Sequence, residues 1–304
     1  MGGIGGGGIQ PRDYSYGANG TVCVNPDVCF CLDWQQPFGS NMENNVSQGF
    51  QLFTIALSAC ILMFYAYEWY KATCGWEEIY VCVVEMSKIC IELVHEYDTP
   101  FCLYLATGSR VLWLRYAEWL MTCPVILIHL SNITGLGTDY NKRTMVLLMS
   151  DIGCIVFGAT AAFANEGYVK CACFLLGMAW GMNTFYNAAK VYYESYVLVP
   201  SGICKLLVAV MAGLYYVSWS LFPILFAIGP EGFGVISLQA STIGHTIADV
   251  LSKNMWGLMG HFLRVQIYKH ILLHGNIRKP IKLHMLGEEV EVMALVSEEG
   301  EDTV

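Results

Sequence analysis

Carboxylates recur every seven residues in one apolar stretch of the chain. Glu78, Glu85 and Glu92 lie within a predicted helix over residues 77–98, together with Lys88. Seven residues return to nearly the same face of a helix, with a drift of about 20°. Each charge at the centre of a membrane helix costs about 2.5–3.5 kcal/mol on the insertion scale. Because one lysine can neutralise only part of this acidic line, the spacing predicts a hydrated path along the helix.

Two other apolar stretches also carry polar residues on one face. A single Ser, Thr or Gln is more often a hydrogen-bonding contact between helices than part of a pore. Three polar faces together, however, can enclose one aqueous path. The first stretch contributes Gln51, Ser58 and Tyr65, and the last contributes Gln239, Thr242, Thr246, Asp249 and Lys253. We expect the lining to include Gln51, Lys88, Glu92, Glu96 and Arg115.

Lys253 could carry covalent chemistry. A lone buried lysine loses its proton because burial disfavours the charged form, and a deprotonated amine forms Schiff bases with aldehydes. A protonated Schiff base needs carboxylates nearby. Asp249, one turn earlier, supplies one, and Glu118 is a candidate for the second. The alternative is a structural Asp–Lys pair of the kind found in transporters, and this helix alone does not separate the two.

The composition places these groups in a membrane. The 304 residues are 55% hydrophobic and 13% charged, with a mean hydropathy of +0.47, whereas soluble domains carry roughly 25% charged residues. This excludes a disordered chain. The net charge of −9 also repels phosphate, so we expect no nucleic-acid partner.

Apolar runs of membrane-spanning length predict a seven-helix, all-α bundle. Short connections place consecutive helices side by side and antiparallel. We expect an N-terminal external segment over 1–47, the bundle over 48–270 and an acidic cytoplasmic tail over 271–304, where the alternation in Val290-Glu-Val292 permits a small hairpin. The predicted spans are 48–71, 77–98, 110–131, 143–164, 168–192, 203–228 and 235–268.

The basic residues orient the bundle, because cytoplasmic loops are enriched in Lys and Arg. With the N-terminus outside and the C-terminus inside, the outer side keeps only Arg12, Arg110 and Lys170. The cytoplasmic side then collects Lys71, Lys142, Arg143, Lys190, Lys205, Arg264, Lys269, Arg278, Lys279 and Lys282.

Three cysteines, Cys23, Cys29 and Cys31, lie in the polar N-terminal segment. An external position favours oxidation, and Cys29 and Cys31 are too close together to pair comfortably, which favours bridges between chains. A three-thiolate metal site would lack a fourth ligand, so we expect no bound metal.

The third span resembles the counterion helix of microbial rhodopsins. It reads Arg115-Tyr-Ala-Glu118-Trp119-Leu-Met-Thr122-Cys123-Pro124. Asp249-Val-Leu-Ser-Lys253-Asn254 resembles their retinal-bearing helix, and Trp219-Ser-Leu-Phe222-Pro223 their sixth helix. The resemblance covers all seven spans in order. Further marks resemble the green-algal channelrhodopsins, namely Gly75-Trp-Glu-Glu78, Thr122-Cys-Pro124, His129, Gly229-Pro-Glu-Gly-Phe233 and Gly244-His-Thr246.

This resemblance implies all-trans retinal bound covalently to Lys253, with Glu118 and Asp249 as counterions and Arg115 nearby. Matching pocket positions are Trp119, Thr122, Cys123, Leu127, Cys154, Phe174, Gly177, Trp219, Phe222 and Ser252. Cys123 and Asp151 match a paired gate. Ser58, Glu85 and Asn254 match a central constriction, and Tyr65, Glu77, Glu78, His129, His261 and Arg264 a cytoplasmic one. Cys23, Cys29 and Cys31 match cysteines that link dimers. Cys154 stands where several relatives carry Thr, so colour and photocycle speed do not transfer.

We therefore predict a light-gated cation channel, a photoreceptor with no enzymatic activity. The resemblance implies a disulfide-linked homodimer in the plasma membrane, in the eyespot region of an alga, that passes H⁺, Na⁺, K⁺ and Ca²⁺. A light-driven outward proton pump is the main alternative. A pump needs a carboxylic acid two turns beyond Cys123, where this chain has His129 with no carboxylate alongside. A photosensory rhodopsin is a third reading. An ordinary seven-helix receptor leaves Glu118, Asp249 and Lys253 unexplained.

Overall fold

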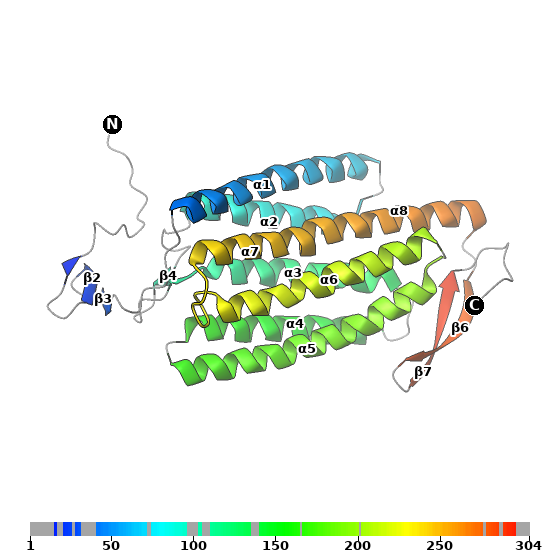
Figure 1. Ribbon diagram of the computed structural model, residues 1–304. Coiled ribbons are helices and arrows are strands. Elements are labelled where there is room, and N and C mark those ends of the chain that lie inside the picture. Colours follow the sequence, from blue (N-terminus) through cyan, green and yellow to red (C-terminus); the bar gives the residue numbers. More distant parts are fainter. Residues whose placement is uncertain are drawn as a thin grey trace.

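The computed structural model in Figure 1 describes most of the helical part of the chain and several short strands. The described residues are 15–16, 21–25, 28–31, 41–71, 74–95, 103–104, 110–134, 140–164, 166–200, 202–275, 278–285 and 288–295.

Seven long helical segments run side by side, which confirms the predicted all-α bundle (Figure 1). Most extend beyond the predicted spans, because hydropathy marks the edge of the apolar layer whereas backbone hydrogen bonds continue into polar sequence. The first six are α1 Asn41–Tyr70, α2 Trp76–His95, α3 Trp113–Thr134, α4 Tyr140–Phe163, α5 Gly167–Leu198 and α6 Ile203–Ile228. The seventh consists of α7 Leu238–Asp249, the π-helical segment η3 Val250–Met255 and α8 Trp256–His274.

The helices form a closed ring. Each helix contacts the next one along the chain, and α1 packs against α7 to close it. Short connections favour this arrangement, because they leave consecutive helices no room to separate. The start of α1 and the end of α8 lie at opposite ends of the bundle (Figure 1), as an odd number of crossings requires.

The seventh segment departs from α-helical geometry around Lys253. The backbone N–H of Trp256 donates to Leu251 O, five residues back, and also to Lys253 O. Single-turn π segments inside α-helices occur frequently at functional sites. Ser252, Lys253 and Asn254 are all buried in this turn. Hydrophobic periodicity did not predict it.

Hydropathy alone identifies only some of these helices as membrane spans. Among the described residues, α1, α4 and α6 contain segments long and apolar enough, namely Met42–Tyr70, Lys142–Phe163 and Ile203–Ile228. α2 carries five charged residues in 20, namely Glu77, Glu78, Glu85, Lys88 and Glu92. Its membrane character therefore follows from its place in the ring.

Short strands lie at both ends of the bundle. β1 Ser15–Tyr16, β2 Thr21–Asn25 and β3 Val28–Cys31 form an antiparallel sheet in which Cys23 is opposite Cys29. β4 Leu103–Tyr104 pairs with β5 Arg110–Val111. β6 Arg278–Met285 pairs with β7 Glu288–Leu295. The side chains of Cys23, Cys29 and Cys31 lie outside the part of the chain that the structure describes.

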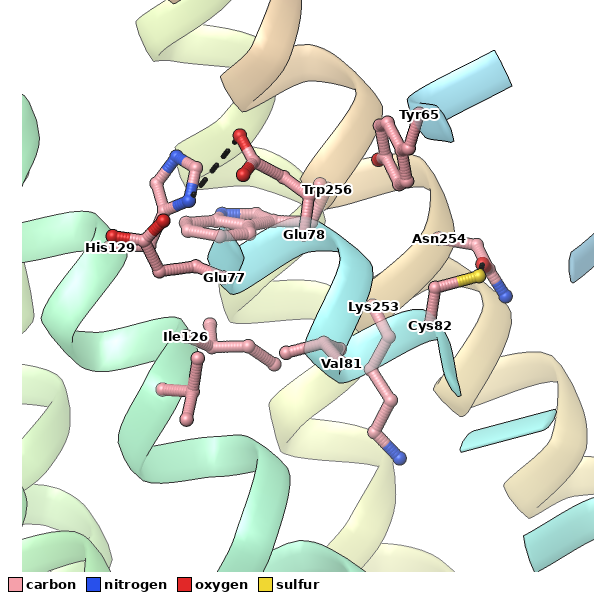
Figure 2. A pocket seen from close by; sticks show the side chains of 12 residues that line it. Tyr65, Glu77, Glu78, Val81, Cys82, Ile126, His129, Lys253, Asn254 and Trp256 are labelled. Atoms are coloured by element: carbon pink, nitrogen blue, oxygen red, sulfur yellow. Dashed lines mark hydrogen bonds and ion pairs between the residues drawn. The ribbon is translucent and has the colours of Figure 1, made fainter. Parts of the chain in front are cut away.

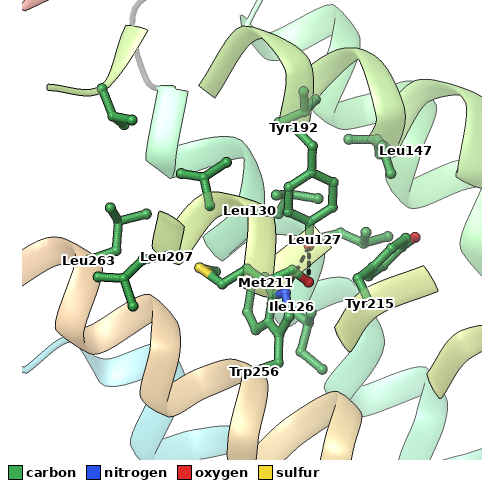
Figure 3. Close-up of a cluster of buried hydrophobic side chains, with 14 of the residues drawn as sticks. Ile126, Leu127, Leu130, Leu147, Tyr192, Leu207, Met211, Tyr215, Trp256 and Leu263 are labelled. Carbon is green, nitrogen blue, oxygen red and sulfur yellow. Dashed lines mark hydrogen bonds between the residues drawn. The ribbon is translucent and has the colours of Figure 1, made fainter. Parts of the chain in front are cut away.

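The largest buried apolar cluster joins α3, α4, α5, α6 and α8 (Figure 3). Leu127, Leu130 and Leu147 are fully enclosed. At the edge of this cluster an ion pair joins α4 to α5, in which Arg143 makes two hydrogen bonds to Glu194. Glu194 is 0% exposed. Removing one partner of a buried pair leaves an uncompensated charge, and this costs more than the pair contributes.

We therefore expect Arg143→Gln to lower the free energy of unfolding by roughly 2–3 kcal/mol. The double variant Arg143→Gln/Glu194→Gln should recover part of this loss, because it leaves no buried charge unpaired. Thermal unfolding followed by circular dichroism in detergent measures both. A double variant less stable than Arg143→Gln alone would show that the unpaired charge is not the cause.

Candidate functional site: a buried amine and two cavities

The amine of Lys253 lies between two carboxylates. Its Nζ is 2.8 Å from Glu118 Oε1 and also forms an ion pair with Asp249. The Thr122 hydroxyl donates to Glu118 Oε1 at 2.9 Å. All four side chains are buried. The two predicted counterions are thus brought together on the predicted lysine, one from α3 and one from its own helix.

A second lysine enters this cluster from α2. Lys88 Nζ lies 3.1 Å from Glu92 and 3.3 Å from Asp249 Oδ2. The pairing of Lys88 with Glu92 follows from their spacing of four residues. The contact with Asp249 joins residues 161 positions apart and could not be read from the sequence. Asp249 therefore accepts from two ammonium groups, whereas Glu118 accepts from one and from a hydroxyl.

The three residues predicted to form a central constriction lie in contact with one another. Asn254 Nδ2 donates to Glu85 Oε2 at 2.8 Å and lies 3.1 Å from Ser58 Oγ. One amide therefore connects α1, α2 and η3. Glu85 is 0% exposed, and its Oε1 has no hydrogen-bond partner among the described residues. The adjacent Cys82 Sγ donates to Ser58 O at 3.3 Å.

Asn254 and Cys82 also line a cavity of about 330 Å³, including its open mouth, which we call the Glu78 cavity (Figure 2). Glu78 lies 2.8 Å from Arg264 Nη1 and 3.8 Å from His129 Nδ1. His261 Nε2 lies 3.6 Å from Glu68. The lining residues are Tyr65, Glu77, Glu78, Val81, Cys82, Val125, Ile126, His129, Lys253, Asn254, Trp256 and Gly257.

The Glu78 cavity corrects one step of the sequence argument. No carboxylate accompanies His129 on its own helix, but α2 brings Glu78 beside it. An acid therefore does lie near His129, and the sequence-based objection to a proton pump no longer holds. Sequence neighbours on α3 could not reveal this, because the acid comes from another helix.

A larger aromatic cavity has a volume of about 890 Å³, including its open mouth, and Lys253 itself is not in its lining. Trp119 and Phe222 pack with ring centroids 4.8 Å apart. Of the predicted pocket residues, the lining includes Trp119, Cys123, Cys154, Phe174, Gly177, Trp219 and Phe222, together with Asp151, which was predicted to belong to a gate. Asp151 Oδ2 has no hydrogen-bond partner in the described part of the chain.

Three predicted pocket residues lie outside this lining. Thr122 hydrogen-bonds Glu118, Leu127 belongs to the apolar cluster of Figure 3, and the Ser252 hydroxyl donates to Asp249 O. Gln51 is buried with its Nε2 unpartnered among the described residues. Glu96 lies outside the described residues.

Two buried residues near the site had no assigned role in the sequence analysis. Glu231, in the connection after α6, accepts a hydrogen bond from Tyr116 and lies 3.7 Å from Arg115. Lys170 Nζ donates to its backbone oxygen at 2.7 Å. His245 on α7 stacks on Trp119 with centroids 5.9 Å apart. Both belong to quoted motifs, but only the packed helices reveal their partners. Arg115 thus pairs with Glu231.

The aromatic cavity fits a flat apolar chromophore. Its walls are rings, which suit such a ligand. A Cβ at Gly177 would meet Cys154 O at 3.3 Å, and one at Gly181 would meet Cys154 Sγ at 3.1 Å, so these glycines let α4 and α5 approach closely along its wall. Trp119 Nε1 is buried without a partner within the described residues. Trp119 directly follows Glu118 on α3, and Glu118 holds the Lys253 amine.

The sequence model of the bacteriorhodopsin-like protein family matches residues 45–267, so the chain belongs to this family of microbial rhodopsins. These are membrane proteins that bind retinal through a lysine. The chain is 22% identical over 211 residues to bacteriorhodopsin-I of Haloarcula marismortui, covering 66% of this chain and 82% of that one. It is 27% identical over 155 residues to bacteriorhodopsin of Halobacterium salinarum, covering 50% and 56%.

Two solved structures are similar to this chain to different degrees. The red light-activated channelrhodopsin Chrimson is similar with a TM-score of 0.84 and 42% identity, covering 93% of this chain and 100% of that one. The proton pumping rhodopsin AR2 of Acetabularia acetabulum is similar with a TM-score of 0.63 and 20% identity, covering 77% and 99%. At 20% identity the second likeness concerns the fold alone.

The amine can be tested by substitution. Protein mixed with all-trans retinal should develop a visible absorption band, and Lys253→Ala should not. Lys253→Arg is the matched control, because it keeps a cation beside Glu118 and Asp249 but does not deprotonate to attack an aldehyde. We expect it to fold and remain colourless. A visible band in either variant would remove Lys253 from the binding site.

Proposed function

We propose that this protein is a light-gated cation channel with all-trans retinal bound covalently at Lys253. One observation carries the proposal. Glu78, Glu85 and Glu92 follow α2 through the interior of the bundle and are 4%, 0% and 4% exposed. Each has a carboxylate oxygen with no hydrogen-bond partner among the described residues. Buried unpaired carboxylate oxygens are costly, and water entering along this line would satisfy them.

Bound retinal supplies light absorption and a change of shape at the lysine. The chain itself holds a proton at Lys253 Nζ, because Glu118 and Asp249 stabilise the ammonium form. When that proton leaves, a neighbouring carboxylate accepts it. Asp249 also faces Lys88 at 3.3 Å, and this second cation favours its ionised form. Glu118 faces one ammonium only, and this favours Glu118 as the acceptor.

The same turn connects this proton to the constriction. Asn254 follows Lys253 in η3, and its amide holds Glu85 and Ser58 together. Strain or a change of charge at Lys253 displaces Asn254, because both residues belong to one π turn. Loss of the two amide contacts separates η3 from α1 and α2. Water then fills the gap along the acidic line.

The acidic lining favours cations. Rings and lines of carboxylates attract cations and exclude anions from a pore. Glu85 is the acid at the constriction, so we assign it the largest share of the selectivity. Protons, Na⁺ and K⁺ are the proposed permeant ions, with Ca²⁺ as a further candidate.

An outward proton pump is the second candidate, favoured by one observation. The pair of His129 and Glu78 offers two proton-exchanging groups in the Glu78 cavity. A pump would use them to return a proton to the lysine across a dry barrier.

The setting of the channel is part of the proposal. The asymmetry of basic residues supports an external N-terminus and a cytoplasmic tail over 271–304. Resemblance to green-algal proteins supports the plasma membrane and the eyespot region. A homodimer linked through Cys23, Cys29 or Cys31 is proposed on the same basis. The register that sets Cys23 opposite Cys29 leaves Cys31 as the cysteine with no cysteine across the sheet.

Whole-cell recording under light flashes separates channel from pump. The reversal potential should be measured in two ionic gradients. We expect the light-evoked current to change sign at a voltage that moves with the cation gradient. A current that keeps one sign at all voltages identifies a pump.

Glu85 can be tested within the same assay. Glu85→Lys should shift the reversal potential toward that of chloride, because it inverts the charge at the constriction. Glu85→Gln keeps an acceptor for Asn254 without the charge, and should give an intermediate shift. Glu166→Lys, at an exposed site before α5, makes the same charge change away from the acidic line and is the control. An unmoved value in Glu85→Lys would remove Glu85 from the selectivity filter.

A further inference from the structure

A chain of buried rings connects the aromatic cavity to the Glu78 cavity. Trp219 lines the aromatic cavity, and its ring lies 4.5 Å from that of Tyr215. Tyr215 lies 5.6 Å from Tyr192, and Trp256 Nε1 donates to Tyr192 OH at 2.8 Å. Trp256 packs edge-on against His129 with centroids 5.3 Å apart. Figure 3 shows the middle of this chain and Figure 2 its end in the Glu78 cavity.

The Tyr192–Trp256 hydrogen bond ties three helices together. Tyr192 is on α5, Trp256 is the first residue of α8, and the Tyr192 hydroxyl lies 3.5 Å from Met211 O on α6. Tyr192 and Trp256 are 4% and 2% exposed. An indole N–H in such a place needs an acceptor, and Tyr192 is the acceptor that the described residues supply.

The position of Trp256 connects this hydrogen bond to the π turn. Trp256 follows directly after η3, the π turn that carries Lys253 and Asn254. A π turn holds one residue more than an α turn, so conversion of this turn to α geometry would rotate the residues that follow. Such a conversion would supply the two-state element that coupling between sites requires.

The first turns of α8 form a wall of the Glu78 cavity with little free space. A Cβ at Gly260 would lie 2.8 Å from His129 Nε2, and one at Gly257 would lie 3.1 Å from Tyr65 OH. Rotation of α8 therefore displaces His129 and Tyr65 directly. Movement at Trp256 therefore reaches the Glu78 cavity, because α8 is in direct contact with His129 and Tyr65.

We propose that Tyr192 is a positioning residue that anchors Trp256, and that this anchor sets how fast the Glu78 cavity returns to its closed arrangement. This rests on the proposed channel function. The anchor touches neither the lysine nor its carboxylates. It acts through Trp256 on the backbone after η3 and on His129.

Tyr192→Phe tests the anchor, because it removes the acceptor and keeps the ring. The hydrogen bond stabilises the closed arrangement and re-forms during closing, so its loss slows the return. We expect the photocurrent to close about fivefold more slowly, with the absorption maximum unchanged, since no charge near Lys253 is altered. Trp256→Phe should give the same slowing. The double variant should slow closing by less than the two single effects combined, because the shared Tyr192–Trp256 hydrogen bond can be lost only once.

Two neighbouring tyrosines provide matched controls. The Tyr215 hydroxyl has no hydrogen-bond partner among the described residues, so Tyr215→Phe removes an oxygen and no bond. Tyr216→Phe removes a hydrogen bond to Phe185 O of 3.0 Å, comparable in length with the anchor. Both should close at the wild-type rate. Equal slowing in Tyr216→Phe would reveal general loosening of the bundle and overturn the assignment.

A spectroscopic measurement separates this proposal from the channel function. Recovery of the starting absorbance after a flash is recorded on purified protein with retinal. If the wild type carries no current, the channel proposal fails, whereas slow recovery in Tyr192→Phe still supports the anchor. If the wild type conducts and Tyr192→Phe closes and recovers at wild-type rates, the anchor is wrong and the channel proposal stands.

Discussion

The burial of a charged amine at the centre of an apolar bundle constrains the rest of this structure. An ammonium removed from water is stable only when carboxylates and hydrogen bonds replace its hydration. Glu118 and Asp249 do this for Lys253, and Asp249 also serves Lys88. With Glu92, which pairs with Lys88, five charged groups thus depend on one another across α2, α3 and the seventh helix. A change at any one of them alters the balance for the others.

Two different cavities lie in this part of the bundle. Lys253 lines the acidic cavity around Glu78, and the aromatic cavity, with room for an apolar chromophore, is lined by Trp119, the sequence neighbour of Glu118. The π turn brings the groups that connect them into one short segment. Lys253 carries the amine, the Asn254 amide donates to Glu85, and the Trp256 ring packs against His129 in the wall of the acidic cavity. This short stretch of chain therefore connects the amine to α2 and to α3.

Several features of the fold were predictable because they depend on short-range pattern. Apolar runs predicted seven helices in order, and spacings of four residues predicted the pairs Asp249–Lys253 and Lys88–Glu92. Helix ends were less well predicted, because α1 begins in polar sequence and α5 continues beyond the apolar layer. The π segment was missed, since it adds one residue to a turn without altering the hydrophobic pattern enough to detect.

The sequence by itself determined the class of the protein and the chemistry of its groups: a membrane bundle, a buried lysine with acidic companions and an acidic line on α2. These follow from residue type and from distances along one helix. Only the tertiary structure decided which groups from different helices meet. It placed Lys88 on Asp249, Glu78 beside His129, Glu231 on Arg115 and Tyr192 on Trp256. The rotation and depth of each helix set these contacts, and they result from packing all seven together rather than from the pattern of any one.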